Sequence, residues 1–372
     1  MSQEIPFNQL RICPESLRIA VDEAIARVVS SHWFILGAEV ESFEREFAEA
    51  MDVDHAVGVA SGTDAITLSL MALGVGGGDE VITTSLTAAF SALAISRTGA
   101  QPVFADIDPE TLNLSPEEAE KCVGPRTKAI LPVHLYGNPC DLDALKRVAE
   151  RHQLALVEDA CQAHGARFQG RAVGGIGHAG AFSFYPTKNL GALGDGGMVV
   201  TNDAELAERV KRLRNGGQSS RYRHQEIGLN SRLDELQAAV LRAKLPYLPE
   251  DNRKRAELVA RYRKGLDAVA GDELSMPSVA TGSESAHHLL VVRLAERDAL
   301  MAHLAERKIQ TLIHYPIPTH LQPAYRDLGL GPGSLPEAER AASDILSLPL
   351  YPTLAPDEVD RVVDAIAAFY DG

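Results

Sequence analysis

KAILPVHLYGNPCDLDALKRVAERHQLALVEDAC, residues 128–161, is the stretch that decides the fold of this chain. It places two apolar runs rich in β-forming residues, 128–137 and 155–161, on either side of a helix-length segment, 141–153. Strand, helix and strand in this order form a βαβ unit, whose two strands lie parallel in one sheet. We therefore expect an α/β fold with a mostly parallel central sheet that helices cover on both faces.

The same alternation extends in both directions, from about Asp54 to Asp203. Further strands are expected at 56–61, 80–85, 102–107, 179–185 and 197–202. Helices are expected at 63–74, 88–99 and 204–215. This part of the chain supplies enough apolar material for one large domain.

The character of the sequence changes at KLPYLPED, residues 244–251, which contains two prolines. After it we expect a long helix, a strand, a helix, a strand and two closing helices, at 252–270, 287–294, 296–308, 309–316 and beyond. This order predicts a smaller α/β domain over 246–372. Residues 1–245 are expected to form the large domain with an N-terminal arm of two helices, which docks on that domain or on a partner subunit.

Composition excludes several classes of protein. The net charge is 36 − 51 = −15, and the nearest basic cluster, Arg253–Arg255, is better explained as a solvated helix face, so no nucleic-acid partner is expected. The four cysteines have no metal-ligand spacing and fit a reducing cytoplasm: Cys13, Cys122, Cys140 and Cys161. No signal peptide and no membrane span are expected, because no apolar stretch is long enough.

An acidic pair ends one of the expected strands, in LALVEDA at 154–160. Glu158 or Asp159 then lies at the carboxyl edge of a parallel sheet, where open α/β folds bind ligands. Only one of the two can face a given side, because side chains alternate along a strand. A helix N-cap or a surface acid is the alternative interpretation.

A single lysine, Lys188, lies in the glycine-rich loop of FSFYPTKNLGALGDGG, residues 182–197. Most loop lysines are simply solvated. This one is bounded by apolar strands, and its glycines allow a ligand to approach the backbone closely. A lysine in a partly dry pocket has a lowered pKa, which makes a free amine available to form a Schiff base.

A possible anion site occurs in ASGTDAI, residues 60–66, where a strand ends and a helix begins. Helix N-termini favour anions, Gly62 would let a phosphate approach, and Thr63 can add a hydroxyl. The alternative is a plain N-cap made by Ser61 or Thr63. Together, a phosphate site, an acid at a strand edge and a loop lysine are what pyridoxal phosphate (PLP) requires, so we expect this cofactor and no metal.

The motifs, taken in order, resemble the DegT/DnrJ/EryC1/StrS sugar aminotransferases, which are PLP-dependent transferases of fold type I. The resemblance covers nearly the whole chain and includes IPFNQL, FILGAEVESFEREFA, ASGTDAI, PVFADIDPETLNL, PVHLYGNPCDLDAL, VEDACQAHGA, FSFYPTKNLGALGDGG, GLNSRLDELQAAVL, HYPIPTHLQPAY and LSLPLYP. It implies that Lys188 carries the cofactor as a Schiff base and shuttles the proton. It also implies that Asp159 is the partner of the pyridinium nitrogen.

The resemblance assigns further cofactor contacts. Gln162 lies beside the ring hydroxyl, Cys161 lies against the ring face, Ser183 binds the phosphate, and Gly62 and Thr63 form the phosphate-binding turn. Asn230 reaches the phosphate of the neighbouring subunit, which implies a homodimer with shared active sites.

This chain departs from many relatives at one cofactor position. Ala88 occupies the place of an aromatic residue that stacks on the ring. The nearest aromatic, Phe90, is expected to be a core residue of its helix and not a replacement.

The implied reaction is transamination, with glutamate or glutamine as donor and a nucleotide-linked keto sugar as acceptor. The lysine loop and HYPIPTHLQPAY are similar to members that act at C3, which favours a dTDP-3-keto-6-deoxyhexose. A UDP-3-keto sugar, a 4-keto sugar and a cyclitol are the alternatives. The expected substrate contacts are Tyr185, His314 and Tyr315 around the sugar, and Arg221, Tyr222 and Arg223 near the pyrophosphate.

Two other functions are known among such relatives. Dehydratases replace the Schiff-base lysine with histidine, so the presence of Lys188 favours transamination. A regulatory, non-enzymatic role is expected to bring an added DNA-binding module, and none is visible in this sequence.

Overall fold

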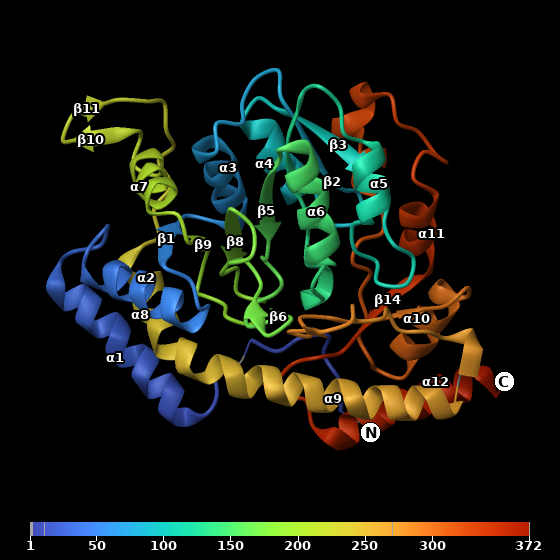
Figure 1. The fold of residues 1–372 in the computed structure, drawn as a ribbon. Coiled ribbons are helices and arrows are strands. Elements are labelled where there is room, and N and C mark those ends of the chain that lie inside the picture. Colours follow the sequence, from blue (N-terminus) through green and yellow to red (C-terminus); the bar gives the residue numbers. More distant parts are fainter. Residues whose placement is uncertain (1–2, 11, 270, 372) are drawn as a thin grey trace.

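The computed structural model describes residues 3–10, 12–269 and 271–371. A seven-stranded sheet forms its centre, and helices cover both of its faces (Figure 1). The strand order is β1 (His55–Val59), β9 (Gly197–Thr201), β8 (Ala179–Ser183), β5 (Ala155–Asp159), β4 (Thr127–Leu131), β2 (Glu80–Thr84) and β3 (Gln101–Ala105). Only β9 runs against its neighbours, because both of its pairings are antiparallel. The predicted α/β fold with a mostly parallel sheet is therefore confirmed.

Alternation along the strands divides the core into two layers. Val157 packs in the layer with α3 (Gly62–Ala72), α4 (Phe90–Arg97) and α7 (Ala204–Leu213). Its neighbour Leu156 packs in the opposite layer, with α5 (Pro116–Lys121) and α6 (Leu142–His152). Side chains two residues apart on a strand face the same side. Glu158 therefore faces the same layer as Leu156, and Asp159 faces the same layer as Val157.

The N-terminal helices α1 (Glu15–Ser31) and α2 (Ala38–Ala50) pack beside α8 (Glu235–Lys244) (Figure 1). The Glu235 carboxylate accepts hydrogen bonds from three backbone N–H groups at the start of α2, those of Gly37, Glu39 and Val40. Such acceptors satisfy the free N–H groups of a helix start. The predicted arm therefore docks on α8 of its own chain.

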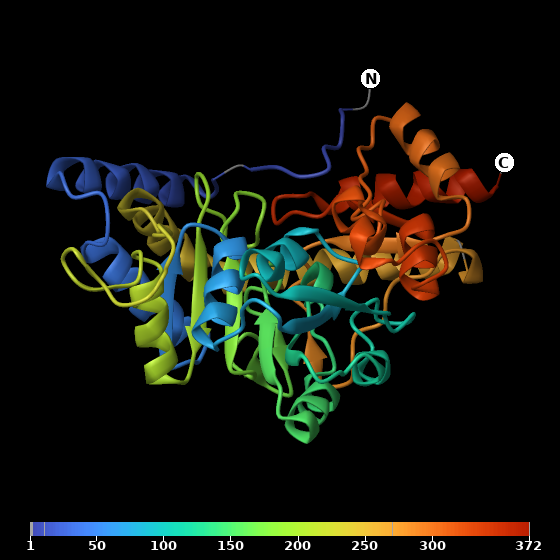
Figure 2. The same cartoon turned by 90° about the horizontal axis from the view of Figure 1, so that it is seen from above.

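The C-terminal part encloses a separate apolar cluster that includes Tyr262, Val292 and Ile366. Its elements are α9 (Leu248–Val269), β13 (Leu290–Arg293), α10 (Arg297–Glu306), α11 (Pro336–Asp344), β14 (Ile345–Leu348) and α12 (Pro356–Tyr370). Short strands complete the fold: β6 (Arg167–Phe168), β7 (Arg171–Ala172), β10 (Gln218–Ser220), β11 (Arg223–His224) and β12 (Ser283–Glu284). Viewed from above, this part lies beside the sheet, with both chain ends on its side (Figure 2). The division at residue 245 stays a prediction.

Two of the strand predictions, 128–137 and 309–316, are partly wrong. In the run 128–137 the continuous strand ends at Leu131, because Pro132 has no N–H to donate. Val133 still makes an isolated parallel bridge with Asp159, and residues 135–137 then form a 3-10 turn. The run 309–316 makes only isolated bridges, at Ile309 and Leu312, and the partner of β13 is instead β14. Within the described ranges, no helix is both long and apolar enough to cross a membrane.

Candidate active site

Three of the predicted features meet at one edge of the sheet. Asp159 ends β5, Ser183 ends β8, and Gly62 begins α3. A Cβ atom on Gly62 would lie 2.7 Å from Cys161 Sγ and 2.7 Å from the Ser183 Cβ, so only glycine lets these segments pack so closely. The carboxyl edge of the parallel strands therefore holds the site, as the topology of such sheets requires.

Asp159 is the acid that faces this edge, on the α3 side of the sheet. Its Oδ2 accepts a hydrogen bond of 2.6 Å from the Ser91 hydroxyl, and its Oδ1 accepts one of 3.2 Å from the Cys161 N–H. The side chain is buried. Each carboxylate oxygen can accept more than one hydrogen bond, so Asp159 retains capacity for a further N–H donor.

Glu158 faces the opposite side and has a structural role. It is fully buried and accepts hydrogen bonds from the N–H groups of Gly174, Ile176 and Gly177 and from the His134 ring, at 2.6–3.1 Å. Burial alone would raise the pKa of this carboxyl, but the hydrogen bonds from His134 and the backbone reverse the effect and lower it. The ambiguity between the two acids is thus resolved in favour of Asp159.

Lys188 lies half-buried in the loop between β8 and β9. Among the described residues, none forms a hydrogen bond or an ion pair with its Nζ. Burial lowers the pKa of the amine, while the nearby Cys161 and Asp159 oppose this shift. An amine that is free of partners and has a lowered pKa is suited to attack an aldehyde.

The start of α3 offers donors to an anion. The Ser61 hydroxyl caps the helix by accepting from the Asp64 N–H at 3.1 Å, so the N-cap alternative describes Ser61 correctly. The N–H groups of Gly62 and Thr63 have no acceptor in the described part of the chain. With the hydroxyls of Thr63 and Ser183 they form a set of donors that a phosphate requires.

Gln162 connects the strand edge to the C-terminal part. Its Oε1 accepts from the Tyr136 N–H at 2.7 Å, and its Nε2 donates to the Tyr315 hydroxyl at 3.1 Å. The adjacent His314 donates or accepts at 2.9 Å with the Ser347 hydroxyl. Burial, and secondarily the Lys188 amine, lowers the pKa of His314 to about 4. His314 and Tyr315 are therefore neutral at neutral pH, and Gln162 joins Tyr315 to the strand edge.

A network of side-chain amides fixes the residue after the lysine. Asn189 donates to the Asn252 Oδ1 and to the Ala286 carbonyl, and its Oδ1 accepts from His288 Nδ1 at 3.1 Å. Asn252 in turn donates to the His164 carbonyl. The lysine loop, α9 and the turn after Asp159 are thus held together. The sequence analysis assigned no role to these residues.

The region around Ala88 requires a correction. Phe90 is not a core residue, because it begins α4 and is 61% exposed. Helical periodicity cannot tell which face lacks a neighbour within the chain. Ser91, one residue later, is buried and bonds Asp159. An isolated serine at a helix start carries no sequence signal that could have revealed it.

The remaining predicted contacts are all exposed in this single chain. Arg221, Tyr222 and Arg223 lie in and around the β10–β11 hairpin, which projects from the body in Figure 1, and all three are exposed. Asn230 is also exposed and bridges Asn215. Tyr185, beside the lysine loop, is 53% exposed.

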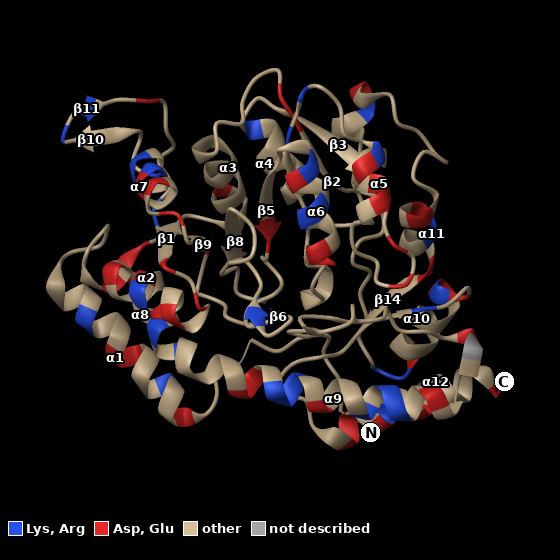
Figure 3. Ribbon diagram, in the orientation of Figure 1, with Lys and Arg blue, Asp and Glu red and all other residues tan. Residues whose placement is uncertain are grey.

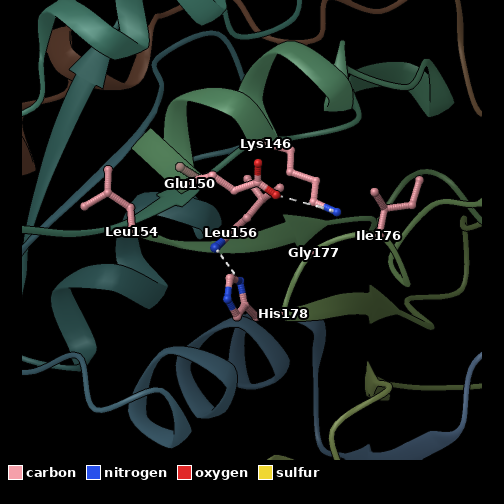
Figure 4. Close-up of a pocket in the computed structure, with 8 residues that line it drawn as sticks. Lys146, Glu150, Leu154, Leu156, Ile176, Gly177 and His178 are labelled. Carbon is pink, nitrogen blue, oxygen red and sulfur yellow. Dashed lines mark hydrogen bonds and ion pairs between the residues drawn. The ribbon is translucent and has the colours of Figure 1, made fainter. Parts of the chain in front are cut away.

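A hollow of about 270 Å³ opens at the opposite edge of the sheet, before β5 and β8 (Figure 4). His178 Nδ1 accepts from the Leu156 N–H at 3.0 Å, and Lys146 lies 3.9 Å from Glu150. Among the described residues that line it, this hollow has no strand-end acid, no partner-free lysine and no free helix start, the three features of the Lys188 edge.

Across the described ranges no cluster of metal-binding side chains is found. Acidic and basic residues intermix on the outer helices in Figure 3, without a basic face.

The site fits PLP on the evidence of its own groups. A partner-free amine, a carboxylate with spare acceptor capacity and free N–H groups at a helix start would hold the aldehyde, the ring nitrogen and the phosphate respectively. The fold and the site therefore define an α/β enzyme of the PLP-dependent class.

Comparison with known proteins identifies the family within this class of PLP-dependent enzymes. Residues 16–367 match the DegT/DnrJ/EryC1/StrS aminotransferase family, and the chain belongs to it. The chain is 51% identical to the dTDP-3-amino-3,4,6-trideoxy-alpha-D-glucose transaminase of Streptomyces venezuelae, over 97% of this chain and 95% of that protein. It is also 51% identical to the erythromycin biosynthesis sensory transduction protein EryC1 of Saccharopolyspora erythraea, over 98% and 99%.

The fold agrees with these relationships. The structure of S. venezuelae DesV in complex with a ketimine intermediate superposes with a TM-score of 0.97 at 49% identity, covering 100% of both chains. This protein is an aminotransferase that uses PLP.

Proposed function

We propose that this aminotransferase transfers an amino group from glutamate or glutamine to C3 of a nucleotide-linked 3-keto sugar, with a dTDP-3-keto-6-deoxyhexose as acceptor. The observation that carries the proposal is the 51% identity, over nearly the full length, to a transaminase of a dTDP-3-amino sugar. The active-site edge supports it, because the groups needed for amino transfer lie there together.

Lys188 is the residue that we assign to proton transfer. Bound PLP supplies an electron sink that stabilises negative charge on the donor α-carbon. The Lys188 amine, once free, takes the proton from that carbon and returns one as general base and acid. Its lowered pKa supports this role, because a neutral amine is needed at working pH.

Asp159 and the start of α3 are assigned to holding the cofactor. The Asp159 carboxylate would accept the N–H of the pyridinium ring and keep that nitrogen protonated. Gly62, Thr63 and Ser183 would bind the phosphate. Gln162 would contact the ring hydroxyl, and Cys161 would lie against the ring face beside Ala88.

The acceptor is assigned to the space beside Lys188, bounded by Tyr185, His314 and Tyr315. Neutral imidazole and phenol groups can donate and accept hydrogen bonds with sugar hydroxyls. Burial raises the pKa of Tyr315 to about 12 and thereby keeps the phenol protonated.

We infer a homodimer with shared sites, in the cytoplasm, where the four free cysteines remain reduced. Large exposed apolar side chains support an unfilled interface in the single chain: Trp33 at 61%, Tyr222 at 79% and Ile227 at 91%. In this arrangement the hairpin would carry the 221–223 group, and the segment after it would carry Asn230, to the partner's site.

One experiment tests the proposed acceptor. The aminated enzyme, prepared with glutamate and freed of excess donor, is mixed in turn with dTDP- and UDP-linked 3-keto and 4-keto sugars and with a keto cyclitol. Return of the PLP absorbance with the dTDP-3-keto sugar, at a rate at least tenfold above the others, is expected. Faster return with another acceptor replaces the proposed substrate. No amination by any amino donor would favour the regulatory role.

A further inference from the structure

We propose that the N-terminal strap, defined as residues Ile5–Asn8, forms one wall of the acceptor pocket, with the Phe7 ring as a specificity-determining surface for the sugar. The inference rests on the proposed function and extends it to a segment that precedes the first helix. It is carried by the contact that joins Phe7 to His314.

The strap is anchored to the C-terminal part by its backbone. The Ile5 N–H donates to the Lys308 carbonyl at 2.9 Å, and the Gln310 N–H donates to the Ile5 carbonyl at 3.0 Å, which makes a parallel bridge. The Phe7 N–H donates to the Gln310 side chain at 3.1 Å. These bonds fix the position of the strap without any contribution from the Phe7 ring.

Ile5 and Phe7 have different surroundings. Ile5 is fully buried in the apolar cluster that contains Tyr262 and Ile309. Phe7 is half-buried and lies outside that cluster. Its ring therefore keeps an apolar surface that the fold itself does not cover.

The ring of Phe7 lies against the active site. It stacks on His314, with 5.5 Å between ring centroids and 26° between the planes. His314 meets the Tyr315 ring edge-on at 5.5 Å, and the Tyr315 hydroxyl accepts from Gln162. Gln162 follows Asp159 by three residues, so this hydrogen bond places the His314–Tyr315 pair beside the strand edge that holds Asp159. One continuous row of side chains thus leads from Phe7 to the strand edge.

The exposed face of Phe7 suits a deoxysugar. The C–H faces and the C6 methyl group of a 6-deoxyhexose are apolar, and an aromatic ring buries such groups without requiring a hydrogen bond. Amino-acid donors lack this apolar ring surface. Phe7 should therefore act on the acceptor half-reaction far more than on the donor half-reaction.

The test measures the two half-reactions separately in Phe7→Ala and Phe7→Leu. Phe7→Ala is expected to raise KM for the 3-keto sugar nucleotide about tenfold, as expected for loss of a partly buried aromatic contact. The donor half-reaction, followed by PLP absorbance with glutamate, should change less than threefold. Phe7→Leu, which keeps an apolar side chain, should lie between Phe7→Ala and the unaltered enzyme.

The matched control is Phe369→Ala, which removes a second half-buried phenylalanine that packs on a histidine, His303, at 5.4 Å. It should leave KM within twofold. Unchanged acceptor KM in Phe7→Ala, or equal losses in both half-reactions, would overturn the role of the strap. Failure of the unaltered enzyme to aminate any nucleotide-linked keto sugar would instead overturn the proposed function, and the strap proposal with it.

Discussion

The hydroxyl of Ser91 donates a 2.6 Å hydrogen bond to Oδ2 of Asp159, and both side chains are buried. A hydrogen bond to an ionised carboxylate in a buried site is short and strong. Ser91 comes from α4 and Asp159 from β5, so the bond fixes the orientation of the acid that we assign to the pyridine ring.

Ser91→Ala is therefore expected to weaken PLP binding about tenfold, which corresponds to the loss of one charge-assisted hydrogen bond. Ser91→Thr keeps the hydroxyl and should restore most of the affinity. The dissociation constant, from absorbance titration of the cofactor-free protein, checks this. Ser96→Ala, in the same helix but bonded to the Ala92 carbonyl, is the control. Equal effects of the two alanine variants would remove Ser91 from this role.

Lys188→Ala should reduce turnover by about 10³-fold or more, because general acid–base catalysis and covalent attachment are both lost. Borohydride reduction followed by mass spectrometry should fix the cofactor on Lys188 in the unaltered protein and on no residue in the variant. Lys146→Ala, at the hollow on the opposite edge of the sheet, should leave activity within twofold (Figure 4). Retained turnover in Lys188→Ala would refute the assignment.

The lowered pKa of Lys188 predicts a pH dependence of cofactor attachment. Only the neutral amine attacks the aldehyde, so the rate should rise with pH and level off once pH exceeds the lowered pKa. The plateau should come below pH 10.5, the ordinary value for lysine. Rapid mixing of cofactor-free protein with PLP over a range of pH measures this, with N-acetyl-lysine amide as the reference amine. A plateau at the same pH for both would contradict the prediction.

Glu158→Gln should destabilise the fold by about 3 kcal/mol. The carboxylate now accepts hydrogen bonds from four donors, and the NH2 group of a glutamine side chain cannot accept them. The pKa of Glu158 is lowered in the folded state, so its stabilisation is present above about pH 4.5 and is lost as pH falls through the lowered pKa. Urea unfolding at pH 7 and at pH 4 should therefore give a smaller difference between the two proteins at the lower pH. Glu150→Gln, in a loose surface ion pair, should change stability by less than about 0.5 kcal/mol.

Shared sites predict complementation between two defective subunits. Lys188→Ala and Asn230→Asp each disable every site of their own dimer, the second by placing a negative charge beside the phosphate. A mixed dimer has one site with both residues intact. Equimolar refolding of the two should restore about a quarter of full activity, since half the dimers are mixed and each has one working site. Failure of two inactive variants to complement would argue against a shared site.

The fold could be predicted from sequence because its strands are apolar runs separated by helix-length segments. β5 and β8 both end within two residues of the expected position. Errors occurred where a local pattern competes with long-range pairing. Residues 309–316 have strand-forming composition, but β13 pairs with β14, which comes more than 50 residues later along the chain.

The site was only partly predictable for a similar reason. Lys188 and Gly62 stand out because loop glycines and a lone lysine form a local pattern. The choice between Glu158 and Asp159 depends on which layer each faces. The strand pattern leaves that choice open, and only the family resemblance assigned Asp159. Ser91 and Asn189 act through partners 68 and 99 positions away, Asp159 and His288, which no local pattern can reveal.

The bridge between Ile5 and Ile309 sets a condition on biosynthesis. Phe7 and its hydrogen-bond partner Gln310 are 303 positions apart. The N-terminal residues are synthesised first, but they can form these contacts only after nearly the whole chain has been made. The sheet edge with Asp159 and Lys188 can be completed earlier, from residues 55–201. A nascent chain therefore assembles the cofactor-binding edge first and closes the strap side of the site last.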